Sequence, residues 1–232
     1  MAEKMGPIIS TNGLVFCVDA ANPQSIVLGQ TIWKDLTFNT TGGTLVNGTY
    51  YTGGTIQFDG TNDWITMSYG SAFTYGTEDF TIECWFKDTS STTVPYSVLY
   101  SQTVSGVNYF VFGVDTVGVN GRVSWIGTLS GGGTPIYASG SYLRNTWNHA
   151  VASRINGIVT VYLNTNAGTP TSNTVDFTNT TYVPTIGDES HHGSSNSWRG
   201  DISVLRIYKS KGLTQAEITQ NFNALRGRYG IW

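Results

Sequence analysis

The stretch TWNHAVASRINGIVTVYLN, residues 146–164, decides the fold class of this chain. Two runs in which apolar and polar residues alternate flank the dipeptide Asn156-Gly157. Asn-Gly is the strongest short signal for a tight turn between antiparallel strands. The stretch therefore predicts a β-hairpin.

A second run, EDFTIECWFKD at residues 78–88, has the same period of two. Four alternate apolar residues, from Phe80 to Phe86, fall on one face of the expected strand, and we assign this face to the core. Trp85 falls on the opposite face. There we expect a loop or a partner to cover it in part.

Further strands follow along the chain. LVFCVD at 14–19 is apolar on both faces, which indicates a central position in a sheet. TIWKDL at 31–36 is a shorter element, and TIQFDGTNDWITM at 55–67 is interpreted as a second hairpin. The remaining strands are expected near 96–101, 107–115, 121–128, 134–139, 173–178, 181–187 and 201–209. This spacing favours an all-β fold, a two-sheet antiparallel jelly-roll β-sandwich.

One short helix is predicted at the C-terminal end, over residues 214–226. Thr214 is placed as the N-cap, and Glu217 completes a capping box three residues later. An apolar stripe begins at Ile218, and Gly227 is expected to end the helix. No linker or repeat interrupts the chain, so residues 13–232 are expected to form one domain behind an N-terminal arm at 1–12.

Composition argues against several function classes. Charged residues make up only 12% of the chain and the net charge is −3. Without a dense basic stripe, a nucleic-acid surface is excluded, and no apolar run has the length of a membrane span. The opening MAEKMGPIIS has no signal-peptide core, so folding in a reducing cytoplasm is expected. Cys17 and Cys84 are then expected to be buried free thiols, with a disulfide as the alternative.

Several motifs together resemble one family. FDGTNDWI (58–65), FTIECWFK (80–87), the stretch at 146–164 and WRGDISVLRIYKSKGLTQAEI (198–218) stand in the order of LamG-like jelly rolls of the concanavalin A-like lectin/glucanase superfamily. The resemblance covers roughly residues 13–226. It implies two curved antiparallel sheets of about six or seven strands each, packed face to face. It says little about ligand, because such domains include sugar binders, protein binders, calcium-dependent adhesins and scaffolds.

A narrower resemblance concerns the opening GLVFCVDAANPQS, the TIWKDL element and the ending LTQAEITQNFNALRGRYG. These are similar to LamG-like domains in tailed-bacteriophage structural proteins, many of them from cyanophages, although the loop TFNTTGG is poorer in Asn-Gly. The resemblance implies a non-enzymatic virion module, in capsid decoration or in a tail or fibre, assembled in the host cytoplasm. Its expected partners are other virion proteins and further copies in a symmetric oligomer. The alternative is a carbohydrate-binding adhesin, with or without calcium, that attaches to host surface glycans.

The acidic residues disfavour an enzyme. Glycoside hydrolysis needs two carboxylates about 5–10 Å apart, and the Glu-x-Asp-x-(x)-Glu strand of related hydrolases is missing. Glu83 is the single acid inside a strong strand. His149 has no identifiable nucleophile or orienting acid beside it, so we expect a hydrogen-bonded structural histidine. The sequence therefore predicts no catalytic residue and no required cofactor.

Calcium is the metal that the loops suggest, because corresponding loops of relatives lie near a calcium ion. Asp59 and Asp63 bracket the GTND turn, and Asp201 opens the last strand. Asp59 and Asp201 could supply two of the six to eight oxygens that calcium takes. In the simpler interpretation Asp59 and Asp63 cap their own turn.

The most polar stretch is the loop GDESHHGSSNSWRGD at 187–201. Its candidate ligand-binding residues are Asp188, His191, Trp198 and Arg199. Trp198 is either a platform for a sugar ring or, more simply, packed under the loop. A zinc site is disfavoured because adjacent histidines rarely reach one metal, and its ligands would have to be Asp188, Glu189, His191 and His192. The simpler interpretation is a solvated loop at an edge of the sandwich.

Overall fold

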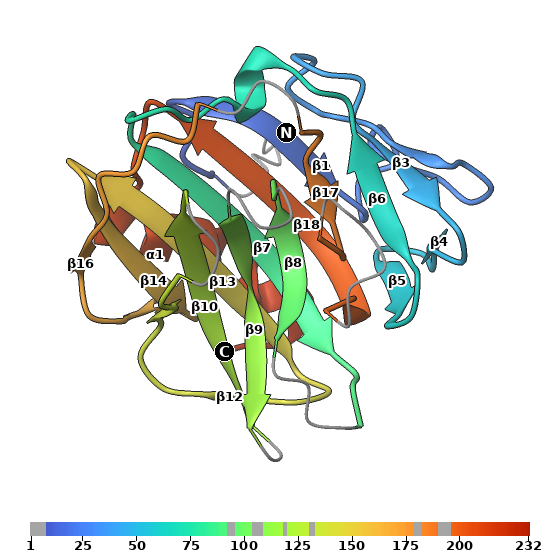
Figure 1. Ribbon diagram of the computed structural model, residues 1–232. Helices are drawn as coiled ribbons and strands as arrows, with labels where there is room; N and C mark the ends of the chain where they lie inside the picture. The colour runs from blue at the N-terminus through green and yellow to red at the C-terminus, as the bar shows by residue number, and fades with distance from the viewer. Residues whose placement is uncertain are drawn as a thin grey trace, which may run out of the picture.

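The computed structural model describes residues 8–91, 96–103, 109–117, 120–129, 133–178, 182–189 and 196–232. Over these ranges two antiparallel sheets pack face to face, and one α-helix lies on the far side of one sheet (Figure 1). The predicted all-β jelly-roll sandwich with a short C-terminal helix is confirmed.

Sheet A is the sheet that carries the helix, and in the described part of the chain it has nine strands. Its order is β15-β14-β13-β7-β18-β5-β4, with β1 paired to β18 and β16 paired to β14. The strands are β1 (Leu14–Asp19), β4 (Tyr50–Tyr51), β5 (Ile56–Asp59), β7 (Phe80–Asp88), β13 (Trp147–Ile155), β14 (Ile158–Leu163), β15 (Asn166–Ala167), β16 (Thr171–Ser172) and β18 (Arg199–Lys209).

Sheet B faces the viewer in Figure 1. Its order is β11-β10-β9-β8-β17-β6-β3-β2, with β12 paired to β10. The strands are β2 (Ile32–Trp33), β3 (Gly43–Val46), β6 (Trp64–Met67), β8 (Ser97–Ser101), β9 (Tyr109–Val117), β10 (Asn120–Thr128), β11 (Ile136–Tyr137), β12 (Tyr142–Leu143) and β17 (Thr185–Ile186). Each sheet exceeds the expected six or seven strands because two-residue strands extend it.

The core between the sheets follows the alternation of the sequence. The even-numbered residues of β7 from Phe80 to Phe86 are all fully buried in the main cluster, as predicted. The hairpin of β13 and β14 is also confirmed. Asn156 and Gly157 have φ of 51° and 74°, which the tight hairpin turn requires. Cys17 and Cys84 are buried free thiols, and burial raises the pKa of both.

The hairpin predicted at 55–67 is wrong. β5 lies in sheet A beside β18, whereas β6 lies in sheet B between β3 and β17. The turn between them therefore carries the chain from one sheet to the other. The carboxylate of Asp63 accepts the backbone N–H groups of Asp59, at 2.9 Å, and Gly48, at 2.8 Å. Alternation could not reveal this, because both strands turn one face to the same core.

Several other predicted strands are shorter than expected. Only 32–33 of the element at 31–36 and 136–137 of the strand at 134–139 are strands. The stretch at 173–178 has only an isolated bridge, between Phe177 and Gly76. Here the buried Arg154 guanidinium donates to the carbonyls of Val175, at 2.9 Å, and Gly76, at 2.8 Å. The Val175 oxygen thus bonds a side chain in place of a neighbouring strand, while the Gly76 oxygen also accepts the Phe177 N–H of the bridge. Of the stretch at 181–187 only β17 is a strand, and residue 181 lies outside the described residues.

The helix α1 (Gln215–Leu225) has the predicted capping box. Thr214 accepts the Glu217 N–H at 3.4 Å, and the Glu217 carboxylate accepts the Thr214 N–H at 2.8 Å. The helical segment does not end at Gly227 as expected. It continues as the 3₁₀ helix η2 (Arg226–Tyr229), whose C-cap is the left-handed Gly230. A second 3₁₀ helix is η1 (Ser71–Phe73). None of the described helices is long and apolar enough to cross a membrane.

The predicted N-terminal arm is described only from residue 8 onward, and residues 1–7 lie outside the described ranges. The Ser10 N–H donates to the Asn221 side chain of α1 at 2.8 Å. The Tyr208 hydroxyl of β18 donates to the Ser10 carbonyl at 3.0 Å. This part of the arm thus lies on the helix side of sheet A. The division into an arm and one domain stays a prediction.

Candidate functional site

The outer face of sheet A, which points away from sheet B, is divided into two halves. One half lies under α1 and η2. There Trp85 of β7 is fully buried, with its ring stacked on Phe222 at 5.6 Å and on Tyr229 at 4.3 Å between centroids. The sequence analysis expected a loop or a partner to cover Trp85 in part. The chain's own C-terminal segment covers it instead.

A buried polar network shares this covered half. Glu83 accepts from Arg206 at 2.7 Å and from Asn221 of α1 at 2.7 Å, and its Oε1 lies 3.0 Å from His149 Nε2. Burial raises the pKa of Glu83, but the Arg206 charge and the hydrogen bonds from His149 and Asn221 outweigh it. Together they lower that pKa from 4.5 to about 2. His149 therefore has the hydrogen-bonded, buried position that the sequence suggested.

The other half of the outer face lies beside α1 and η2 and is the more open of the two in the described part of the chain. Five side chains cross it in one line over five neighbouring strands; Asp201 among them is buried, and Trp147 borders η2. Tyr50 of β4 lies opposite Gln57 of β5, and Gln57 lies opposite Asp201 of β18. Asp201 lies opposite Lys87 of β7, and Lys87 lies opposite Trp147 of β13. Directly opposed side chains on one face are neighbours. We call these five residues the cross-strand row.

The row combines aromatic ends with a polar middle. Lys87 and Asp201 form an ion pair at 2.7 Å, and the Gln57 amide lies 3.4 Å from Asp201. The Tyr50 hydroxyl donates to Gln57, and half of the Tyr50 side chain is exposed. At the other end the half-buried Trp147 ring has Tyr229 at 4.7 Å and the Lys87 ammonium at 5.4 Å. Trp147 is thus held from two sides, whereas Tyr50 is free to meet a ligand.

A hollow of about 300 Å³ lies beside the row. It is bordered by Tyr50 and Gln57 of the row and by Arg199 and Asp59, which lie opposite each other in register. Arg199 is exposed, and its guanidinium makes no hydrogen bond or ion pair with any residue that the structure describes. The hollow therefore offers a positive and a negative side chain at its rim.

The structure brings three of the sequence candidates together at this place and leaves others apart. Asp201 is in the row, and Asp59 and Arg199 border the hollow next to it. Trp198 lies in the core, 1% exposed and edge-on to Phe86 at 5.6 Å. The Trp198 ring therefore offers no face to a sugar, because Trp198 directly precedes β18 and its side chain lies on the core side.

The polar loop of the sequence analysis is only partly described. Asp188 is buried beside sheet B, where its carbonyl accepts the hydroxyls of Ser101 and Thr185, so it is remote from an open ligand surface. His191 and His192 lie outside the described residues. At those two histidines the candidate ligand site, the disfavoured zinc site and the simpler interpretation of a solvated loop all stay untested.

The described carboxylates near the row do not fit a calcium cage of six to eight oxygens. Asp201 is neutralised by Lys87, and Asp59 accepts the Thr61 N–H at 2.7 Å. Both oxygens of Asp63 accept backbone N–H groups, which is the turn-capping role of the simpler interpretation. Across the described ranges, three or more His, Cys, Asp or Glu side chains nowhere form a group that could hold a metal.

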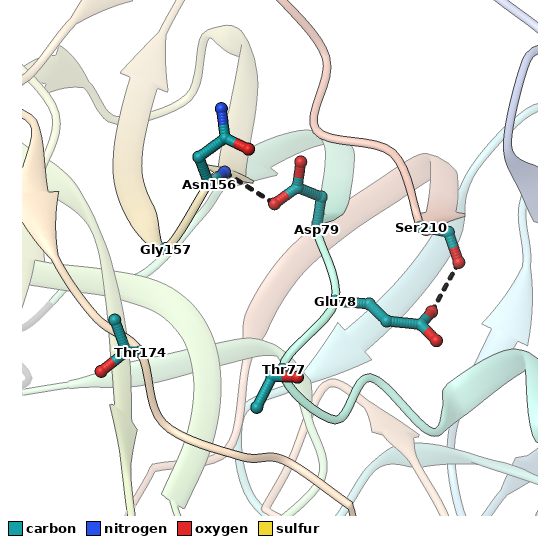
Figure 2. Close-up of a pocket in the computed structure, with 7 residues that line it drawn as sticks. All are labelled: Thr77, Glu78, Asp79, Asn156, Gly157, Thr174 and Ser210. Atoms are coloured by element: carbon teal, nitrogen blue, oxygen red, sulfur yellow. Dashed lines mark hydrogen bonds between the residues drawn. The ribbon is translucent and has the colours of Figure 1, made fainter.

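A larger hollow of about 520 Å³ lies at the opposite end of β7. Figure 2 shows its two carboxylates engaged: the Asn156 N–H donates to Asp79, and the Ser210 hydroxyl donates to Glu78. The other lining residues are Thr77, Gly157 and Thr174. None of the described residues that line this hollow is aromatic, and both of its carboxylates have partners, so the cross-strand row is the stronger candidate site.

The four residues of the row other than Asp201 were missed by sequence reasoning. Alternation assigns Gln57, Lys87 and Trp147 to the outer faces of predicted strands, but it cannot say which strands are neighbours. Tyr50 lies on the two-residue strand β4, which alternation does not predict. Tyr50 and Trp147 are 97 residues apart in the chain. Trp198, which the sequence analysis considered as a platform for a sugar ring, is a core residue.

Solved structures with a similar fold include carbohydrate-active proteins. Domain 4 of an extracellular arabinanase from Geobacillus stearothermophilus, in complex with arabinotriose, has a TM-score of 0.71 and 17% identity, over 91% of this chain and 99% of that one. Trypanosoma rangeli sialidase in complex with 2,3-difluorosialic acid has a TM-score of 0.62 and 15% identity, over 94% of this chain and 34% of the sialidase. Both identities are low, so these likenesses show the fold alone.

A third similar structure is the binding domain of Paraclostridial Mosquitocidal Protein 1, with a TM-score of 0.60 and 18% identity, over 91% of this chain and 52% of that one. A search of curated proteins found no significant match. Residues 59–219, more than half of the chain, match a laminin G family model. The chain therefore belongs to the concanavalin A-like lectin/glucanases superfamily.

Proposed function

We propose that this chain is a non-catalytic carbohydrate-binding module that binds glycans through the cross-strand row. The observation that carries the proposal is the row itself. On the open half of sheet A it places an exposed tyrosine, an amide, a carboxylate, an ammonium group and an indole side by side. Sugars present hydroxyl groups and apolar ring faces, which such polar and aromatic side chains bind.

The similarity to known folds supports the same class. The arabinanase domain matches this chain over nearly the full length of both, and its structure holds arabinotriose. Fold alone does not carry function. The comparison therefore supports a glycan as ligand class without saying which sugar binds.

The position of Glu83 supports a non-catalytic role. Both of its oxygens accept hydrogen bonds, and the residue is fully buried under α1. Glycoside hydrolysis needs an acid and a second carboxylate on either side of the scissile bond. A glycan cannot reach Glu83 while the helix is in place, so we expect binding without cleavage.

A glycan array tests the proposal. The protein is applied with calcium and again with EDTA, beside the variants Gln57→Ala and Tyr69→Ala. Tyr69 is a half-exposed tyrosine outside the row, so Tyr69→Ala is the matched control. We expect a group of related glycans to bind the natural protein and the control but not Gln57→Ala. We also expect no cleavage of these glycans, measured as an unchanged number of reducing ends. An array without hits in both buffers would contradict the proposal.

The two buffers also test calcium. The described carboxylates have protein partners, so we expect the same hits in calcium and in EDTA. Hits that disappear in EDTA would revive the calcium-dependent adhesin and would call for a metal site at residues outside the described ranges.

Virion assembly is the second candidate function. Its supporting observation is a set of highly exposed apolar side chains: Leu28 is 83% exposed, Phe38 87% and Trp232 92%. A neighbouring subunit could cover such groups. Light scattering of the purified chain tests it. A stable trimer or larger ring that EDTA leaves unchanged would support assembly, and a lone monomer that never copurifies with particles would contradict it.

A further inference from the structure

The cross-strand row has a defined length. Strands of one sheet lie about 4.8 Å apart, so a row across five strands is roughly 19 Å long from Tyr50 to Trp147. A sugar residue in an extended glycan, from one glycosidic oxygen to the next, is about as long as one strand spacing. A glycan that touches both ends of the row must therefore have about four or five residues.

The charges in and beside the row are matched. Lys87 and Asp201 form an ion pair within it. Arg199 and Asp59 lie opposite each other in register at the rim of the hollow. A third carboxylate, Asp63, also borders the hollow, but it is buried and both of its oxygens accept backbone N–H groups of the turn. The remaining groups are two cations and two anions, so they give the site no net charge to attract an acidic or a basic ligand.

The two ends of the row differ in rigidity. Trp147 is packed against Tyr229, and η2 is fixed to the body because Arg228 donates to both oxygens of Asp19, at 2.8 and 3.0 Å. Tyr50 lies on β4, which is an edge strand of sheet A. A fixed aromatic end saves the ordering cost of binding, whereas the edge position leaves Tyr50 room to follow the ligand.

We propose that the ligand is a neutral, linear oligosaccharide of at least four residues that lies across the strands from Tyr50 to Trp147. This inference rests on the proposed function and adds the length, the charge and the direction of the glycan. A shorter glycan reaches one aromatic end only. A longer glycan projects past β4, at the edge of the sheet, and gains no further contact with the row.

Calorimetric titration with length series tests this inference. The probes are α-1,5-linked arabino-oligosaccharides, β-1,4-linked cello-oligosaccharides and β-1,3-linked laminari-oligosaccharides of two to six residues, with oligogalacturonides of the same lengths as the charged series. We expect one neutral series to gain at least tenfold in affinity from two to four residues and less than twofold from five to six. Dimers that bind as tightly as tetramers, or galacturonides that bind more tightly than every neutral series, would overturn it.

Variants at the two ends sharpen the test. Tyr50→Ala and Trp147→Ala should each lower the affinity for the five-residue glycan at least fivefold. No more than one of them should lower the affinity for the two-residue glycan. If Trp147→Ala does not fold, Lys87→Met replaces it, because Lys87 lies one strand from that end. An affinity for the two-residue glycan that falls equally in both end variants would overturn the inference. If no glycan of any series binds, the proposed function itself fails, which is a distinct result from binding without a length dependence.

Discussion

The two halves of the outer face of sheet A use the same kinds of side chain in opposite ways. Under α1, Arg206 and Glu83 form an ion pair whose side chains are 4% and 0% exposed. On the open half, the ion pair of Lys87 and Asp201 has side chains that are 29% and 6% exposed. Aromatic rings accompany both pairs. The two pairs differ in the helix that covers the first of them, which leaves Lys87 of the second pair partly accessible to a ligand.

The cover changes the energetics as well as the access. A buried charge that loses its partner pays a desolvation penalty of several kcal/mol, whereas an exposed ion pair contributes about 0–1 kcal/mol. Substitutions in the covered half should therefore reduce stability, and those in the open half should reduce binding. The following predictions separate these two effects, from the largest to the smallest.

The largest effect is expected for Glu83→Ala. The substitution leaves the buried Arg206 without its carboxylate and removes an acceptor from His149 and Asn221. We expect the free energy of unfolding to fall by about 3–5 kcal/mol, measured by urea denaturation at pH 7. A loss below about 1 kcal/mol would mean that the network does not hold the helix on the sheet.

Acid should act through the same residue. The pKa of Glu83 is lowered from 4.5 to about 2, so its contribution to stability is fully present above pH 4.5 and is lost as the pH falls toward 2. We therefore expect the unfolding free energy to fall between pH 4.5 and pH 2. In Glu83→Gln, which cannot titrate, this fall should be smaller. Parallel curves for the two proteins would contradict the assignment.

Removal of the helix cap should have a moderate effect. Thr214→Ala deletes the side chain that accepts the Glu217 N–H, and loss of such a cap costs about 1 kcal/mol. Thermal unfolding measures the loss, with Thr219→Ala as control because Thr219 is a partly exposed threonine in the middle of the same helix. Equal losses in both variants would show that the cap has no special role.

The smallest effect on stability is expected in the row. Lys87→Met breaks the ion pair with Asp201, in which Lys87 is 29% exposed and Asp201 only 6%. Because Asp201 keeps the Gln57 amide as a neighbouring donor, we expect the unfolding free energy to change by no more than about 1 kcal/mol. The same variant should weaken glycan binding at least fivefold. A loss of stability as large as that of Glu83→Ala would mean that the row stabilises the fold in the same way as the network under α1.

Much of the fold could be predicted because local patterns report it directly. The Asn156-Gly157 turn, the alternation along β7 and the capping box at Thr214 each depend on residues close in sequence. The turn at 55–67 was misassigned because two strands with the same alternation can lie in one sheet or in two. Here the Asp63 carboxylate accepts the backbone N–H groups of Asp59 and Gly48, and so stabilises the turn that carries the chain from sheet A to sheet B.

The candidate site could be predicted only in fragments. Asp59 beside its turn, Asp201 at the start of the last strand and Arg199 in the polar loop were candidates from the sequence, and they do lie together. The rest of the row depends on the pairing of β4, β5, β18, β7 and β13, whose register joins residues more than a hundred positions apart. Such register arises from the packing of the whole sheet and leaves no local signal at Tyr50 or Trp147.

The central claim is that the open half of sheet A binds the glycan, and an NMR titration tests it most directly. Isotope-labelled protein is titrated with the tightest oligosaccharide of the length series, and backbone amide shifts are followed residue by residue. We predict that the largest shifts cluster at Tyr50, Gln57, Lys87, Trp147 and Asp201. Shifts confined to the outer face of sheet B, around Arg122 and Tyr137, would contradict the account.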